Sequence, residues 1–360
     1  MAAPGGPNIA EGEHVGCRLV NRRTWTLLTS VVLVAAFGLL GAFVRVPYVA
    51  LGPGPTFNTL GSDGGAPVIS VEGERTYPTA GHLNMTTVSV TDHLSMFGAL
   101  GLWVSGRYAL APRELYFPPD KTEQEIEQQN TAAFSDSQTV AKTAALSHLG
   151  YPTEVVVDRI VPGSPAEGLL APGDRVLSAN GKPVPDAAAL RTALTGTTPG
   201  TEVPIEVQRG DEQPRTVTAR LGENPTGDQQ GFLGVAAAER ADVDFDVQIR
   251  LADVGGPSAG LMFALAIIDK LTPGELNGGR FVAGTGEISA TGDVGPIGGI
   301  PFKMTKAREA GATTFLVPAG NCAEAAAQAP EGLQLAKVGT LDEALAALEA
   351  LRNGQQPAGC

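Results

Sequence analysis

The sequence predicts a mixed α/β fold of the α+β type, divided into more than one folded unit and preceded by a single membrane-spanning helix. A chain of 360 residues is longer than one hydrophobic core usually organises. Stretches of alternating apolar and polar side chains, typical of half-buried strands, are interleaved with Ala-rich helical stretches. An uncharged apolar run lies near the N-terminus.

The apolar run, residues 25–44, is 20 residues long and as a helix would span about 30 Å, the thickness of a bilayer core. A cleaved signal peptide usually has a shorter apolar core, and a buried core helix would show a polar face. We therefore predict a transmembrane helix that is retained as an anchor. Arg18, Arg22 and Arg23 precede this helix, and Arg45 closely follows it. The positive-inside rule then makes residues 1–24 a cytoplasmic tail and places the remainder outside the cytoplasm.

Composition excludes several classes of function. Acidic residues outnumber basic ones by 38 to 25, and no basic stripe is present, which excludes nucleic acid as a partner. The four histidines are scattered and form no HExxH motif, so we expect no metal site and no cofactor. The three cysteines form no CxxC motif, which leaves at most a pairing of Cys322 with Cys360.

The first segments after the anchor differ sharply in character. Residues 45–65 are dense in Gly and Pro and predict an extended linker that holds the body off the membrane. Residues 66–150 predict the first part of the main unit. Their strands run to about residue 90, and a helix over 122–149 is ended by Gly-Tyr-Pro at 150–152.

The remaining segments complete two units. Residues 151–223 contain short β-branched strands separated by Gly/Pro turns. Residues 224–353 return to a mixed pattern, with a strand near 245–251, a Gly-rich turn, an apolar helix and later strands and helices. The final helix opens with a capping box at 340–343, and residues 354–360 form a flexible tail.

Three motifs in the small unit resemble those of a PDZ domain: Gly-Ser-Pro-Ala at 163–166, Gly-Asp-Arg-Val at 173–176 and Asn-Gly at 180–181. The resemblance implies a module that binds the end of an extended peptide as an added strand. The alternative is a small β-module that only supports its neighbours. Two segments fit the carboxylate-binding loop, and both remain open: Leu-Gly-Tyr at 149–151 and Phe-Leu-Gly-Val at 232–235.

Residues 256–260, Gly-Pro-Ser-Ala-Gly, fit the G-x-S-x-G elbow that exposes a serine at the start of a helix. A short Gly/Ser string also serves as a plain helix cap. As a nucleophile, Ser258 needs a base, and no histidine follows residue 148. Lys270, 12 residues further along the same predicted helix, would lie about 18 Å away along its axis.

Lys303 is the preferred base. It follows a compact turn and falls in the first turn of a predicted helix, where an ammonium opposes the helix dipole by ~0.3–1 kcal/mol. Burial lowers the pKa of a lysine by up to ~3–5 units, and the flanking Ile300, Phe302 and Met304 supply an apolar wall. Lys306, one turn further on, is the alternative base.

The order of these motifs resembles the proteolytic domain of the Lon protease family, which uses a serine–lysine dyad. The likeness rests on residues 255–267, Thr-Gly-Glu-Ile at 285–288, and residues 292–300 followed by Lys303. It implies Ser258 as nucleophile, Lys303 as general base and Thr285 as the residue that orients the lysine. Backbone N–H groups of Ser258 and Gly256 would form the oxyanion hole. The PDZ-like unit would be an insertion in this domain.

An anchor, a PDZ-like unit and a Lon-like domain together resemble membrane-anchored bacterial Lon-like proteins, which implies a homo-oligomer, a hexamer. No G-x-x-x-x-G-K-[ST] motif occurs, so we predict ATP-independent cleavage of peptide bonds in extracytoplasmic proteins. Gly255 replaces an acidic residue common in the family. One alternative is an inert adaptor that captures peptides. Another is an enzyme like signal peptidase, but its serine would lie close to the membrane, whereas Ser258 comes about 200 residues after the predicted anchor.

Overall fold

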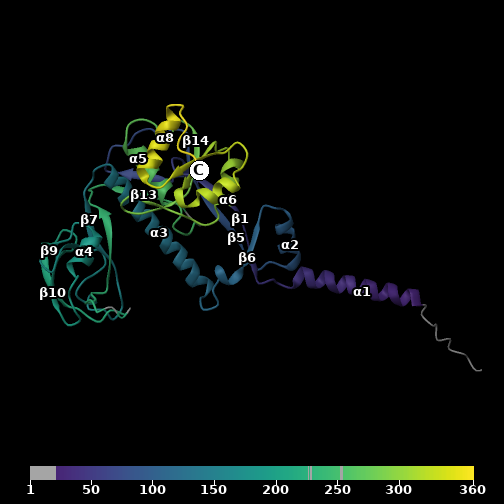
Figure 1. The fold of residues 1–360 in the computed structure, drawn as a ribbon, viewed down its shortest axis with the longest axis horizontal. Coiled ribbons are helices and arrows are strands. Elements are labelled where there is room, and N and C mark those ends of the chain that lie inside the picture. The colour runs from purple at the N-terminus through teal and green to yellow at the C-terminus, as the bar shows by residue number, and fades with distance from the viewer. Residues whose placement is uncertain (1–21, 226, 228, 252–253) are drawn as a thin grey trace, which may run out of the picture.

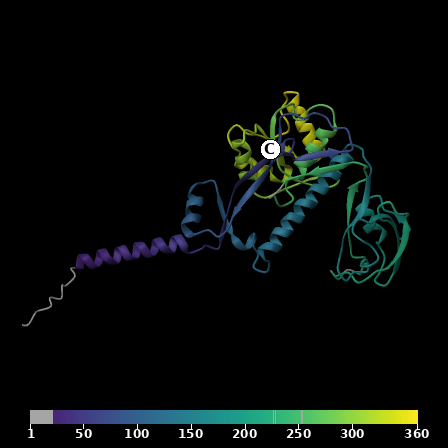
Figure 2. The ribbon, with the colours of Figure 1, turned by 180° about the vertical axis from the view of Figure 1, so that it is seen from behind.

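The computed structural model describes residues 22–225, 227, 229–251 and 254–360. It has a long N-terminal helix, α1 (Arg22–Phe43), a main α/β body, and a small β-rich unit on the other side of the body (Figures 1 and 2). The predicted mixed α/β class with an inserted β-rich unit is confirmed. Within the described residues, α1 is the helix that is long and apolar enough to cross a membrane. Arg18 and the rest of residues 1–21 of the predicted tail lie outside the described part.

One six-stranded sheet organises the body, in the order β18-β17-β14-β5-β1-β6. The first four of these strands pair in parallel, and β1 is antiparallel to both of its neighbours. Segments from both halves of the chain therefore build a single sheet. Its strands are β1 (Tyr48–Asn58), β5 (His82–Thr91), β6 (Ala109–Pro112), β14 (Phe281–Gly284), β17 (Thr314–Pro318) and β18 (Gln334–Val338).

The predicted linker over residues 45–65 is wrong, because most of it is strand β1, which pairs with β5 and β6. The pairing register shifts between Pro53 and Thr56, and a bulge accommodates residues that lack an N–H. Gly52 lies where a Cβ would overlap the ring of Tyr108. The Gly and Pro residues therefore serve close packing and a bulge, although their composition suggests a flexible spacer.

Helices cover the sheet. Helix α5 (Gly260–Leu271) is buried from Gly260 to Asp269 and packs against the long helix α3 (Glu123–His148). Helix α6 (Ile300–Glu309) packs against β1 and β5. The predicted helix over 122–149 is confirmed, and it begins with a full capping box. Two further helices are α7 (Cys322–Ala327) and α8 (Leu341–Arg352).

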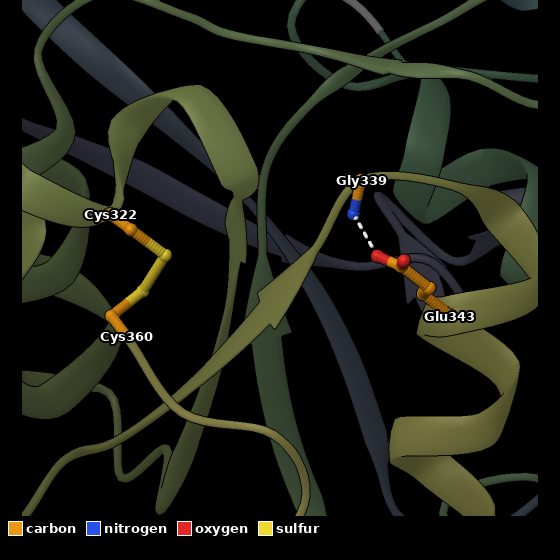
Figure 3. Close-up of a disulfide and its surroundings, with 4 residues drawn as sticks. All are labelled: Cys322, Gly339, Glu343 and Cys360. Carbon is orange, nitrogen blue, oxygen red and sulfur yellow. Dashed lines mark hydrogen bonds between the residues drawn. A yellow bond between two sulfur atoms is a disulfide. The ribbon is translucent and has the colours of Figure 1, made fainter.

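The start of α8 differs slightly from the predicted capping box. The Thr340 hydroxyl accepts a hydrogen bond from the N–H of Glu343, as expected. The carboxylate of Glu343, however, accepts from the N–H of Gly339 at 2.6 Å (Figure 3). The same region contains a disulfide between Cys322 and Cys360, so the predicted flexible tail is tied to α7 at its last residue (Figure 3).

The small unit is a second sheet in the order β11-β10-β8-β7-β12, with its own apolar core. Strand β12 lies beyond residue 223 and forms one edge, so the sheet continues past the predicted end of this unit. The elements are β7 (Thr153–Ile160), β8 (Arg175–Ala179), β9 (Lys182–Pro183), α4 (Ala187–Ala193), β10 (Glu202–Gln208), β11 (Arg215–Arg220) and β12 (Val235–Ala241).

Short elements complete the fold. Outside the main sheets, β2 pairs with β3, β15 pairs with β16, and β4 pairs with β13. Helix α2 follows β5. Their bounds are β2 (Ser62–Asp63), β3 (Ala66–Pro67), β4 (Ile69–Glu72), α2 (Met96–Val104), β13 (Asp246–Ile249), β15 (Glu287–Ile288) and β16 (Val294–Gly295). Two 3₁₀ turns are Arg113–Leu115 and Ala319–Asn321.

Candidate active site

Ser258 lies on a tight turn that leads directly into α5. Gly256 in this turn has φ of 85°, a left-handed conformation that favours glycine. The Ser137 hydroxyl of α3 donates to the carbonyl of Pro257 at 3.0 Å. On the other side, the Ser258 carbonyl accepts from the N–H of Gly286 and from the hydroxyl of Thr285, both at 2.9 Å. The turn is therefore held from two directions, as the predicted elbow requires.

Lys303 meets Ser258 although 45 residues separate them in the sequence. Its Nζ lies 2.8 Å from Ser258 Oγ and 2.9 Å from Thr285 Oγ1. The Thr285 hydroxyl uses its proton on the Ser258 carbonyl, so its oxygen accepts from the amine. Lys303 is 3% exposed and Thr285 is fully buried. The structure thus brings together three of the residues that the sequence predicts.

Burial changes the protonation of the amine. Desolvation lowers the pKa of Lys303 to about 8, against an opposing effect of the nearby Glu287 carboxylate. Ile300 and Met304, two of the three predicted wall residues, are fully buried on the same helix. At pH 7 about a tenth of Lys303 is then the free amine, compared with well under a thousandth for an ordinary lysine.

The pair opens into a cleft of about 570 Å³. Strands β1 and β5 form one wall, and the Ser258 turn and residues 297–299 form the others. Gly299 has φ of 72°, and a Cβ there would lie 2.6 Å from Val88, so this loop needs glycine to approach the strand.

Asn321 fixes that loop and was not predicted from the sequence. Its side-chain amide accepts from the N–H of Ile297 and donates to the carbonyl of the same residue, both at 2.8 Å. Asn321 lies 24 residues further along the chain, in the turn before α7, and no local pattern marks it. It acts as a positioning residue for the cleft wall.

Two groups that the sequence predicted for the site, the N–H of Gly256 and the alternative base Lys306, do not point towards Ser258 in the structure. The N–H of Gly256 donates to the carbonyl of Asn130 at 3.0 Å, so in the structure it does not face the cleft. The N–H of Ser258 has no hydrogen-bond acceptor within the described part of the chain. Lys306, the alternative base, is partly exposed and lies 3.7 Å from Glu309 instead of near the serine.

Gly255, where this chain departs from the family pattern, packs closely on α3. A Cβ at this position would lie 3.0 Å from the Cβ of Asn130. A side chain at this position would require Asn130 or the turn to move by a few tenths of an ångström. Glycine at position 255 therefore allows the Ser258 turn to lie close against α3.

An elbow serine beside a buried amine is the arrangement of serine hydrolases that use lysine as their base. Two regions of the chain match known families. Residues 238–350 match the model of the Lon protease (S16) C-terminal proteolytic domain, and residues 124–221 match the model of the PDZ domain. The chain therefore combines a PDZ domain with a Lon-type proteolytic domain, which confirms both predicted resemblances.

Curated relatives match about a third of the chain. Lon protease 1 of Sorangium cellulosum is 38% identical over 126 residues, which is 34% of this chain and 15% of that protein. Lon protease 2 of Herpetosiphon aurantiacus is 38% identical over 118 residues, or 29% of this chain and 14% of that protein. This chain thus spans about one seventh of each relative. Among solved structures, the PDZ domain of an SdrC-like protein from Listeria monocytogenes is 20% identical to the aligned part of this chain, with a TM-score of 0.21. The alignment covers 23% of this chain and 86% of the Listeria chain.

Proposed function

We propose that this chain is a membrane-anchored, ATP-independent serine endopeptidase that uses a Ser258–Lys303 dyad. The observation that carries the proposal is the 2.8 Å distance between Lys303 Nζ and Ser258 Oγ, with the Lys303 side chain only 3% exposed. The free amine takes the proton of Ser258 as its oxygen attacks the scissile carbonyl. The resulting ammonium gives that proton to the leaving amine, and water then hydrolyses the acyl-enzyme.

The other groups of the site have supporting roles in this mechanism. Thr285 accepts from the amine and so directs its lone pair towards Ser258. The N–H of Ser258, at the entrance of α5, is the donor that we assign to the oxyanion hole. The wall formed by β1 and β5 offers a peptide an extended backbone to lie along.

We assign substrate capture to the edge strand β12 of the PDZ domain. A peptide can be added only to a strand with a free side, and β7 is flanked by β8 and β12. This favours the loop 232–235, which leads into β12, over the loop 149–151, which leads into β7. The Thr143 hydroxyl of α3 donates to the carbonyl of Glu239, which limits pairing to the first half of β12.

Two observations support a catalytic domain outside the cytoplasm. The disulfide between Cys322 and Cys360 suits an oxidising compartment (Figure 3). Arg22 and Arg23 stand at the N-terminal end of α1, as expected for the cytoplasmic side of a span. A closed homo-oligomer, a hexamer by resemblance to Lon proteases, is part of the same proposal.

The test uses the full chain in lipid nanodiscs and a fluorogenic peptide whose C-terminus enters the PDZ domain. We expect Ser258→Ala to abolish cleavage while peptide binding stays unchanged, because only the nucleophile is removed. Ser135→Ala, an exposed serine on α3, is the matched control and should cleave at the wild-type rate. Binding without cleavage by the wild-type chain would favour the adaptor alternative, and cleavage by Ser258→Ala would exclude Ser258 as nucleophile.

A further inference from the structure

Helix α2 has an apolar outer face that the described part of the chain leaves largely exposed. The inner side of α2 packs into a small apolar cluster near the N-terminal end of β1, which includes Ala50 and Leu94. No charged residue occurs between positions 94 and 106. A surface helix normally turns charged or polar side chains outwards. Here the outward residues are 40–70% exposed and apolar: Met96, Phe97, Leu100, Trp103 and Val104.

The helix is fixed against the last turn of α1. Phe97 lies so close to Gly41 that a Cβ on the glycine would overlap its ring. The backbone N–H of Met96 donates to the carbonyl of Val44, and that of Val46 donates to the carbonyl of Leu94. Both views of the ribbon show α2 beside the junction of α1 and the body (Figures 1 and 2). If α1 spans a bilayer, α2 lies at the depth where the span ends.

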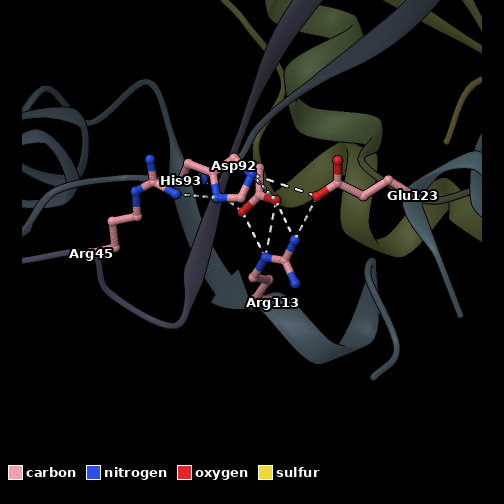
Figure 4. Close-up of polar contacts among 5 residues, drawn as sticks. All are labelled: Arg45, Asp92, His93, Arg113 and Glu123. Carbon is pink, nitrogen blue, oxygen red and sulfur yellow. Dashed lines mark hydrogen bonds and ion pairs between the residues drawn. The ribbon is translucent and has the colours of Figure 1, made fainter. Parts of the chain in front are cut away.

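Charged contacts hold α2 to the body at both ends. Before α2, Asp92 and His93 belong to a polar cluster in which Arg113 bonds Asp92 at 3.0 Å and Glu123 at 3.2 Å (Figure 4). Arg45, just after α1, lies 3.4 Å from the His93 ring.

After α2, a second charged contact completes the attachment. Arg107 forms a 2.7 Å ion pair with Glu309 at the end of α6, the helix that carries Lys303. The orientation of α2 relative to the catalytic body is thereby set from both sides.

We propose that the outer face of α2 lies in the surface layer of the same bilayer that α1 spans. This rests on the proposed membrane anchor. A lipid surface fits because the apolar face is continuous with the end of the span and carries a tryptophan, which favours the headgroup region. Val90, which lines the cleft, is five residues from Ser95, at most about 18 Å of extended chain. Docking of α2 therefore holds the cleft close to the membrane.

The chain has two tryptophans, Trp25 in α1 and Trp103 in α2, so the docking of α2 can be tested separately from the insertion of α1. The full chain is reconstituted in phosphatidylcholine vesicles with acyl chains brominated near the headgroup or left unbrominated. In Trp25→Phe, the remaining Trp103 should show blue-shifted emission and lose at least half of its intensity in brominated vesicles. Aqueous iodide should quench it weakly. In Trp103→Phe, the remaining Trp25 reports the insertion of α1.

The outcomes are distinct. Quenching of Trp25 by bromine together with iodide-accessible Trp103 would overturn the α2 proposal and leave the anchor intact. Trp103 shielded from both quenchers would indicate a second copy of the chain on α2 and would also overturn it. Lack of bromine quenching at both positions would contradict the anchor and the docking together. In the Trp25→Phe background, Leu100→Glu should at least halve the bromine quenching, whereas Val161→Glu on the PDZ domain should leave it unchanged.

Discussion

We expect the replacement of Lys303 by methionine to lower kcat/KM for peptide cleavage by roughly 10³-fold or more. Methionine fills a similar apolar space, but its thioether sulfur is far too weak a base to take the Ser258 proton. Lys306 is directed to Glu309, and Lys270 lies at the far end of α5, so neither replaces the lost amine. Initial rates with a fluorogenic peptide measure the effect.

The same substitution should not destabilise the fold. The pKa of Lys303 is lowered by burial to about 8, so below pH 8 the folded state holds an ammonium that burial disfavours. Between pH 8 and the unfolded value of ~10.4, the unfolded state binds more protons, and stability rises with pH. At pH 7 this burial costs about 3 kcal/mol, which Lys303→Met removes together with two hydrogen bonds. We expect a Tm at pH 7 no lower than that of the wild type.

The matched control is Lys306→Met, three residues along the same helix. Lys306 is 38% exposed at its side chain, and we expect less than about a threefold change in activity. Full activity in Lys303→Met, or a severe loss in Lys306→Met with Lys303 intact, would contradict the assignment of the base.

We expect Asp174→Ala to destabilise the PDZ domain by about 3 kcal/mol, the lower end of the range for breaking a buried ion pair. Asp174 is fully buried and accepts from Arg209 at 2.7 and 2.9 Å and from the N–H of Ala171 at 2.9 Å. Arg209 is half exposed, which is why the lower end applies. Hydrogen exchange of the β7, β8 and β10 amides in the full chain measures the loss.

The pH dependence of this contribution follows from the same contacts. The hydrogen bond from Arg209 lowers the pKa of Asp174 in the folded state. The stabilisation that ionised Asp174 provides is therefore fully present above the pKa of ~3.9 that an aspartate has in the unfolded chain. It is lost as the pH falls from there through the lower pKa of the folded state. Asp158→Ala, which removes an exposed ion pair with Arg159, is the control and should change stability by less than about 0.5 kcal/mol. Equal losses in the two variants would show that the burial of Asp174 has no special role.

Local patterns predicted the elements whose signals are local. The helix over 122–149, the final helix with its Thr340 cap and the strand near Asp246–Ile249 lie where capping residues and alternation place them. The G-x-S-x-G motif and elimination among the lysines predicted Ser258 and Lys303, and the resemblance to Lon proteolytic domains added Thr285. The structure places the Lys303 amine within hydrogen-bonding distance of the other two side chains, and the roles of all three remain predictions.

Contacts between distant segments were not predictable in this way. The Gly/Pro-rich stretch became β1 because β5 and β6 supply partners for its backbone, and its own composition indicates a linker. Asn321 holds Ile297 across 24 residues, and Asn130 takes the N–H of Gly256 from a helix more than 120 residues earlier. Such pairings depend on the assembled sheet and its helices, which no window of sequence contains.

The central claim is that the amine of Lys303 is uncharged in a substantial fraction of molecules near neutral pH and deprotonates Ser258. The most direct test is the rate at which a fluorophosphonate labels Ser258 in the full chain between pH 6 and 10.5, with the labelled residue mapped by mass spectrometry. We expect the rate to rise tenfold per pH unit at low pH, to level off around a midpoint of about 8, and to become very low in Lys303→Met. A midpoint near that of an ordinary lysine, or labelling of Ser258 that is unaffected by Lys303→Met, would contradict the claim.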